Sequence, residues 1–177
     1  MPPPARISAG EAIGSLIAIV FGLVFVVVNS GEQAAPWPLV VRVAGVVVAV
    51  ALVMLLLRRG KPEGGAGTTF FDRGRFRWIV FAEVVALFAG LYVINGVLGH
   101  GEAGVAWIAL VVGVHFVAMG RAFRLTRFRA LGGTMTVLGL AGFALAFANA
   151  GAAAIGLVAG VLSGVALFAV AFYTVRR

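Results

Sequence analysis

Two ionisable residues, Glu83 and His115, lie in stretches of sequence that are otherwise apolar. Glu83 interrupts WIVFAEVVALFAG (residues 78–90), and His115 interrupts VVGVHFVAMG (residues 111–120). An unpaired charge at depth in a bilayer costs several kcal/mol or is neutralised by a change of protonation. A carboxylate and an imidazole can satisfy each other and can share a proton. This pair is therefore the candidate proton or ion site of the chain.

The spacing of both residues from basic residues predicts that they meet. Glu83 follows Arg77 by six residues, and His115 precedes Arg121 by six residues. At a helical rise of 1.5 Å per residue, each lies about 9 Å from the basic end of its helix. A short connection joins the two stretches, so the helices are expected to be antiparallel, with both residues inside the bundle in its cytoplasmic half. Two interpretations follow: a protonatable site in an ion or substrate path, or a contact that only holds two helices together.

The elements that carry these residues are predicted to cross a membrane. The chain has 177 residues, of which 62% are hydrophobic and 11% charged, and its mean hydropathy is +1.11. A bilayer-spanning helix needs about 20 mostly apolar residues. Apolar segments of about this length occur at residues 11–28, 38–57, 78–98, 104–120, 130–148 and 152–175. The sequence therefore predicts an all-α membrane protein, a bundle of six transmembrane helices.

Short connections on one side divide the chain into three antiparallel helical hairpins. We expect an N-terminal tail (1–10), a first hairpin (11–57), a basic loop (58–77), a second hairpin (78–120), a second basic loop (121–129) and a third hairpin (130–177). An Asn near the outer end of the first helix of each hairpin suggests, without establishing, a repeated unit.

The positions of the basic residues predict the orientation of the chain. Lys and Arg cluster before the first span, in the two basic loops and at the C-terminal end, namely Arg6, Arg58, Arg59, Lys61, Arg73, Arg75, Arg77, Arg121, Arg124, Arg127, Arg129, Arg176 and Arg177. By the positive-inside rule, both termini are cytoplasmic and the protein lies in the cell inner membrane.

The same charges predict which partners the chain has. The net charge is +8 and the isoelectric point is near 11.7, but the basic residues flank the spans and form no separate basic face for nucleic acid. We expect contact with the bilayer, and with anionic lipids at the cytoplasmic face. The aromatic and basic segment FFDRGRFRW (residues 70–78) is a candidate interfacial segment.

Three further residues define a possible polar site on the outer side: Arg42, Asn29 and Asn95. Arg42 lies about one turn into the second span and shares a helical face with Gly45 and Ala49. It could pair there with an acidic residue of an outer loop, Glu32 or Glu102, or extend to the outer interface. The Asn residues could instead cap helices.

Small residues repeat at a spacing of four on the first and last spans. Such ridges allow helix backbones to approach closely in lipid. They comprise Gly10, Gly14, Ala18 and Gly22 on the first span, Ala152, Gly156, Gly160 and Gly164 on the last, and Ala82, Ala86 and Gly90 on the third. The ridges could pack against each other within one chain, or they could pack against a second protomer in a homo-oligomer.

Enzyme chemistry finds little support in the sequence. The chain has no cysteine, which excludes thiolate metal sites and thiol catalysis. Ser163 in GVLSG lacks the Gly-x-Ser-x pattern of rhomboid proteases, and one His with one Glu is an incomplete metal site. We expect no metal or other cofactor. The leading hypothesis is a small proton-sensitive transporter or channel-like protein, and the alternative is a non-transporting scaffold or assembly protein.

Reporter fusions test this topology. Fusions after Arg59, Arg129 and Arg177 are expected to report the cytoplasm, because basic clusters stay inside. Fusions near Glu32 and Glu102 are expected to report the outside. A single reversed reporter would contradict the six-span arrangement.

Overall fold

All the regular secondary structure in the described part of the chain is helical. The structure is a computed structural model that describes residues 9–59, 74–122 and 124–176. The helices are α1 (Ala9–Asn29), α2 (Trp37–Arg58), α4 (Gly74–Leu91), the π-helix η1 (Tyr92–Val97), the 3₁₀ turn η2 (Gly101–Ala103), α5 (Gly104–Ala122), α6 (Thr126–Phe147), α7 (Ala152–Ile155), the π-helix η3 (Gly156–Val161) and α8 (Leu162–Arg176). Six continuous helical segments are long and apolar enough to cross a membrane.

The helices extend beyond the apolar windows that predicted them. Helix α6 begins at Thr126 and α4 at Gly74, four residues before each predicted span. Arginine and phenylalanine are acceptable in a helix, so a basic cluster ends an apolar window without ending the helix. Of the predicted loop 121–129, the described residues are consequently helical except for Arg124 and Leu125.

Some of the predicted features fall outside the described residues. They are most of the N-terminal tail with Arg6, most of the loop 58–77 with Lys61 and Arg73, residues 70–73 of the interfacial segment, and Arg177.

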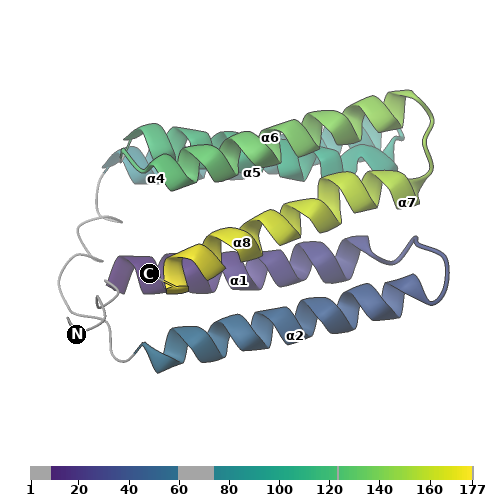
Figure 1. Ribbon diagram of the computed structural model, residues 1–177. Coiled ribbons are helices and arrows are strands. Elements are labelled where there is room, and N and C mark those ends of the chain that lie inside the picture. The colour runs from purple at the N-terminus through teal and green to yellow at the C-terminus, as the bar shows by residue number, and fades with distance from the viewer. Residues whose placement is uncertain (1–8, 60–73, 123, 177) are drawn as a thin grey trace.

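The bundle is flattened, with helices α2 and α4 at its two edges (Figure 1). Helix α2 packs on α1, which packs on α8. Helix α8 and η3 contact the pair α5–α6, and α4 lies against α5. The start of α1, the end of α8 and the turn between α5 and α6 lie at one end of the bundle, and the α1–α2 and α6–α7 connections lie at the other (Figure 1). The edge position leaves α4 with only 6% of its apolar window buried, against 50% for the window of α5.

The most extensive contact in the bundle joins α5 to α6 through glycines. A methyl group at Gly132 would lie 2.5 Å from the carbonyl oxygen of Gly113 and 2.5 Å from the amide nitrogen of Val117. At Gly139 it would lie 2.6 Å from the amide nitrogen of Leu110. The two backbones therefore touch, which only glycine permits.

This glycine seam was not predicted, because its small residues do not recur at a spacing of four. On these helices they recur every seven positions: Ala106, Gly113 and Gly120 on α5, and Gly132 and Gly139 on α6. A seven-residue repeat also keeps residues on one side of a helix.

Helix α1 faces η3 and α8, and the predicted small-residue ridges of the first and last spans meet there. A methyl group at Gly164 would lie 2.7 Å from the carbonyl oxygen of Gly22, and one at Gly156 would lie 2.8 Å from that of Asn29. The Asn29 side chain also packs directly on Gly160. These ridges meet within one chain, so this contact needs no second protomer.

Two other predicted packing glycines behave differently. A methyl group at Gly14 would have nothing within 4 Å, so the expected close contact there is wrong for this chain. Gly90 receives the indole ring of Trp107 from α5. The small residue on α4 thus accommodates a large side chain and does not bring two backbones together.

Neighbouring glycines on α6 provide a matched test of the seam. Gly132→Ala is expected to destabilise the protein by about 1–3 kcal/mol, because its methyl group meets backbone atoms that cannot move independently. Gly133→Ala meets nothing within 4 Å, and should be neutral or stabilising by up to about 1 kcal/mol. Thermal unfolding in detergent measures both. Equal melting temperatures for the two variants would contradict a close backbone contact between α5 and α6 at Gly132.

Candidate functional site

Glu83 and His115 lie side by side between α4 and α5. Oε2 of Glu83 is 3.0 Å from Nδ1 of His115, and the two side chains are only 17% and 13% exposed, respectively. The helices are antiparallel, because Glu83 lies opposite His115 while Gly90 lies opposite Trp107. The structure thus brings together the two residues whose spacing predicted a contact.

The geometry of this contact is that of an ion pair without a well-formed hydrogen bond. The 3.0 Å separation is short, but Nδ1 has no partner that meets the angular requirement of a hydrogen bond. The distance is the more informative of the two, because a small ring rotation changes the angle and leaves the two groups in contact. The charges attract when the imidazole is protonated and the carboxylate is ionised.

A proton is needed for this contact to be favourable. A carboxylate only accepts hydrogen bonds, and an unprotonated Nδ1 also only accepts them. Two facing acceptors repel, so a proton must reside on Nδ1 of His115 or on the carboxyl group of Glu83. Either side of the pair can hold that proton.

The surroundings of the pair place it at the periphery of the bundle. Helix α4 packs mainly on α5, so the expectation that the pair lies inside the bundle is corrected to a position on an edge seam. The seam is also held by Trp107, whose Nε1 donates to the carbonyl oxygen of Ala86 at 3.0 Å. Phe116 packs edge-on to the His115 ring, with centroids 5.5 Å apart.

Trp107 was not singled out in the sequence, although an indole in a span needs a hydrogen-bond acceptor when buried. That requirement is the signal that could have identified it. The acceptor is the carbonyl oxygen of Ala86, which also belongs to the backbone of α4. The sequence does not single out this carbonyl, so only the three-dimensional arrangement identifies it as the acceptor.

Metal binding is not supported by the arrangement of ligands in the described segments. They contain no group of three or more His, Cys, Asp or Glu side chains that could hold a metal ion. The other histidine, His100, pairs with Glu102 through Nδ1 and Oε1 at 2.9 Å, in an exposed connection. Each pair offers two ligands, whereas a protein zinc site uses three or four.

Of the three predicted outer-side residues, the structure brings two to one place. Nε of Arg42 donates to the carbonyl oxygen of Val27 at 3.1 Å and to Oγ of Ser30 at 3.3 Å. These acceptors flank Asn29, whose Nδ2 donates to the carbonyl oxygen of Phe25 at 2.8 Å. The expected alternatives for Arg42, pairing with Glu32 or Glu102, are replaced by contacts to the last turn of α1.

Asn95 is separated from this group, on the edge helix. Its Nδ2 donates to the carbonyl oxygen of Leu91 at 2.8 Å, the same bond to the residue four positions earlier that Asn29 makes. Asn149 has φ of 54° and ends α6, since the amide of Ala150 bonds the carbonyl of Leu145 at 2.9 Å. All three Asn residues therefore contact or terminate helix ends.

Gln33 is an outer-side polar residue that was not predicted from the sequence. Its Nε2 donates to the carbonyl oxygen of Ala153 at 2.8 Å, and its Oε1 is buried with no partner among the described residues. The bond joins the α1–α2 connection to α7, two segments 120 positions apart.

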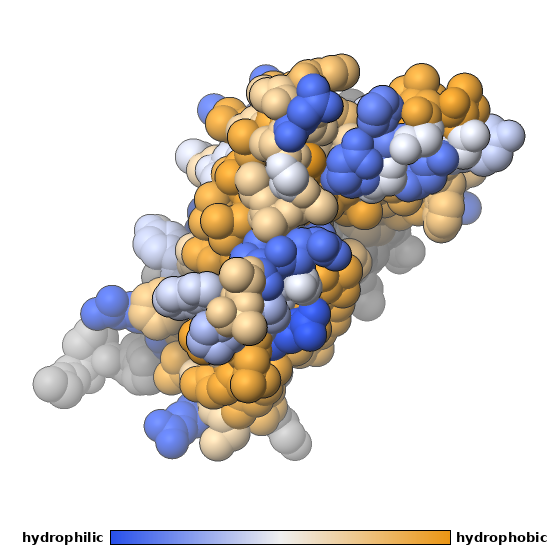
Figure 2. All heavy atoms as spheres, turned by 90° about the vertical axis from the view of Figure 1, so that its right-hand side faces the viewer, coloured by the Kyte–Doolittle hydropathy of each residue, from blue (hydrophilic) through white to orange (hydrophobic). Residues whose placement is uncertain are grey.

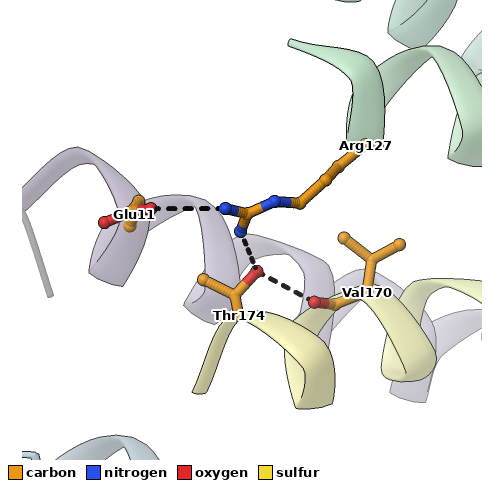
Figure 3. Close-up of polar contacts among 4 residues, drawn as sticks. All are labelled: Glu11, Arg127, Val170 and Thr174. Carbon is orange, nitrogen blue, oxygen red and sulfur yellow. Dashed lines mark hydrogen bonds and ion pairs between the residues drawn. The ribbon is translucent and has the colours of Figure 1, made fainter. Parts of the chain in front are cut away.

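A polar cluster at the opposite end links three helices (Figure 3). Nη2 of Arg127 on α6 is 3.9 Å from Oε1 of Glu11 on α1, and Nη1 is 3.5 Å from Oγ1 of Thr174 on α8. Thr174 in turn donates to the carbonyl oxygen of Val170 at 2.9 Å. The guanidinium also lies over the Tyr173 ring, 5.5 Å from its centroid. Because its two charges are substantially exposed, this cluster contributes orientation more than stability.

The fold and the site together have the features of a multi-pass helical membrane protein with an ionisable pair between two of its spans. Comparisons with protein-family models, with curated proteins and with solved structures gave no match.

A double-mutant cycle measures the contact between Glu83 and His115. Glu83→Gln and His115→Gln are each expected to destabilise the protein, because each leaves a mostly buried group without its charged partner. The double variant should be less destabilised than the sum, with a coupling free energy of about 0.5–2 kcal/mol.

The exposed pair of His100 and Glu102 is the matched control. It has the same chemistry and a similar distance, but solvent screens it, so its coupling should be under about 1 kcal/mol. Additive effects at Glu83 and His115 would mean that the two side chains do not interact.

Proposed function

We propose that the chain is a small proton-sensitive transporter or channel-like protein of the cell inner membrane, with Glu83 and His115 as its proton or ion site. The proposal includes three antiparallel hairpins, α1–α2, α4–α5 and α6–α8, with both termini in the cytoplasm. The observation that carries it is the 3.0 Å contact of a carboxylate with an imidazole within two apolar spans. Intramembrane ionisable residues are functional candidates by default.

The position of α4 gives the pair a mechanical consequence. Helix α4 has no backbone seam comparable to that between α5 and α6 among the described residues. It is held on α5 by the ion pair at Glu83, in the middle of α4, and by Trp107, which bonds Ala86 three residues further along. When the imidazolium loses one proton, the ion pair becomes a single hydrogen bond if the remaining proton stays on Nδ1, and becomes two facing acceptors if that proton is on Nε2. In the second case the α4–α5 contact would weaken at the pair, while Trp107 still holds α4 at Ala86 and Gly90.

Proton transfer within the pair needs no other reactant. The N–H bond at Nδ1 of the imidazolium breaks as an O–H bond forms at Oε2 of Glu83, which leaves a neutral imidazole and a neutral acid. A transported ion or solute would be coupled to this step by the position of α4.

A scaffold or assembly protein is the second candidate, and the edge position of α4 favours it. Only 6% of the residues in its apolar window are buried, and the outward-facing side of α4 is covered by no other described helix. In that case the pair only fixes the orientation of α4 for contact with a second copy or another membrane protein. The basic residues at the predicted cytoplasmic end would contact anionic lipid in either case.

Flux measurements in proteoliposomes separate the two candidates. Under an imposed pH gradient, wild-type protein is expected to carry protons, or a solute together with protons, and Glu83→Gln should abolish this flux while the protein remains folded. Glu102→Gln is the matched control, because it removes an exposed carboxylate outside the seam and should leave the flux unchanged.

Either of two results would overturn the transport proposal and favour the scaffold. One is the absence of wild-type flux across a broad panel of ions and small solutes. The other is unchanged flux in folded Glu83→Gln and His115→Gln variants.

A further inference from the structure

Arg42 lies on α2 near the end of the bundle that carries the α1–α2 connection. It follows Trp37, the first residue of the helix, by five positions, so it lies about 7.5 Å along the helix axis. Figure 2 views the bundle from this end, where hydrophilic side chains gather in patches between hydrophobic ones. A long arginine side chain at this depth can bring its guanidinium to the boundary between hydrocarbon and headgroups.

The guanidinium of Arg42 is held in place through one of its nitrogens. Its Nε donates to the carbonyl oxygen of Val27 and to Oγ of Ser30. The carbonyl belongs to the last turn of α1, where carbonyls lack helical partners. Ser30 is itself fully buried and donates to the same carbonyl at 3.2 Å. Two acceptors on a different helix therefore fix the direction in which the guanidinium points.

This anchoring leaves the other two nitrogens of the guanidinium for a ligand. Neither Nη atom forms a hydrogen bond or ion pair with a residue that the structure describes. Glu32, the acidic residue nearest in the α1–α2 connection, is exposed and is not the partner. The positive charge of Arg42 is thus oriented but not neutralised, and it remains exposed.

The two Nη groups of Arg42 are suited to binding an oxyanion. The two Nη groups present parallel N–H donors, which match two oxygens of a phosphate or carboxylate. The neighbouring surface of α2 is apolar and outward-facing, with Leu39 68% exposed and Val46 45% exposed. A ligand that satisfies both surfaces carries its anion next to hydrocarbon chains, and Trp37 is the kind of residue that lies at headgroup level.

We propose that Arg42, anchored by Val27 and Ser30, binds the phosphate group of a phospholipid at this end of the bundle. The site lies apart from Glu83 and His115, and it does not depend on which side of the membrane this end faces. Its loss would leave proton transfer at the α4–α5 seam intact, so the failure of one proposal does not decide the other.

Lipid binding to purified protein tests the proposal. The protein is prepared in a maltoside detergent, which contains no phosphate, and titrated with phosphatidylglycerol while native mass spectrometry follows the tightest lipid adduct. Arg42→Gln is expected to weaken that adduct about tenfold, the change that corresponds to one charge-assisted hydrogen-bonded contact. Glu32→Gln, which removes an exposed charge in the adjoining α1–α2 connection, is the control and should not weaken it.

Two further variants keep the test informative if Arg42→Gln does not fold. Arg42→Lys retains the charge but loses both the Nε anchor and the paired Nη donors, and it should weaken the adduct several-fold. Ser30→Ala removes one anchor and should weaken it in the same direction by a smaller factor. Unchanged binding in folded Arg42→Lys and Ser30→Ala would overturn the proposal.

Two other ligands identify the source of the anion. Monogalactosyl diacylglycerol, which has the same acyl chains without phosphate, should bind at least tenfold more weakly than phosphatidylglycerol, and equal binding would overturn the proposal. Inorganic phosphate at millimolar concentration should not displace the lipid adduct. Displacement would identify a soluble anion as the ligand and would overturn the assignment to a lipid.

Discussion

The contact between the backbones of α5 and α6 is the constraint on which the rest of the bundle depends. Lipid gives apolar helices no hydrophobic reason to associate, so close packing must supply the attraction. Glycines at 113, 132 and 139 let the two main chains touch along most of their length. The pair becomes a rigid unit, and α4 on one side and η3 with α8 on the other are positioned against it.

In the candidate site, one residue is firmly positioned and the other lies on a weakly attached helix. His115 lies on α5, and the glycine contact with α6 fixes the position of α5. Glu83 lies on the edge helix α4. Helix α4 is attached by an ion pair, by one indole hydrogen bond and by the fit of that indole on Gly90. A helix attached by few contacts is expected to open locally at a lower free energy than the well-packed helices of the bundle.

The two ends of the bundle are fastened by polar side chains that reach between helices distant in sequence. At one end Arg127 links α6 to α1 and α8, and at the other Gln33 links the α1–α2 connection to α7. Arg42 adds a contact between α2 and the last turn of α1. These contacts are made where water or headgroups lower the cost of charge, and between them the helices meet through glycine and apolar side chains.

The sequence by itself determined the number of apolar helices and the depth of the ionisable pair, because hydropathy and the rise per residue depend only on order along the chain. It also indicated the ridges of α1 and α8, since their spacing is local. Tertiary structure decided that the most extensive contact joins α5 to α6, that Gly14 makes no close backbone contact with the described residues, and that the Glu83–His115 pair lies between α5 and the edge helix α4. It also decided that Arg42 bonds the end of α1. Helix neighbours in lipid are chosen by the fit of whole surfaces, and that choice is not encoded in any one stretch of sequence.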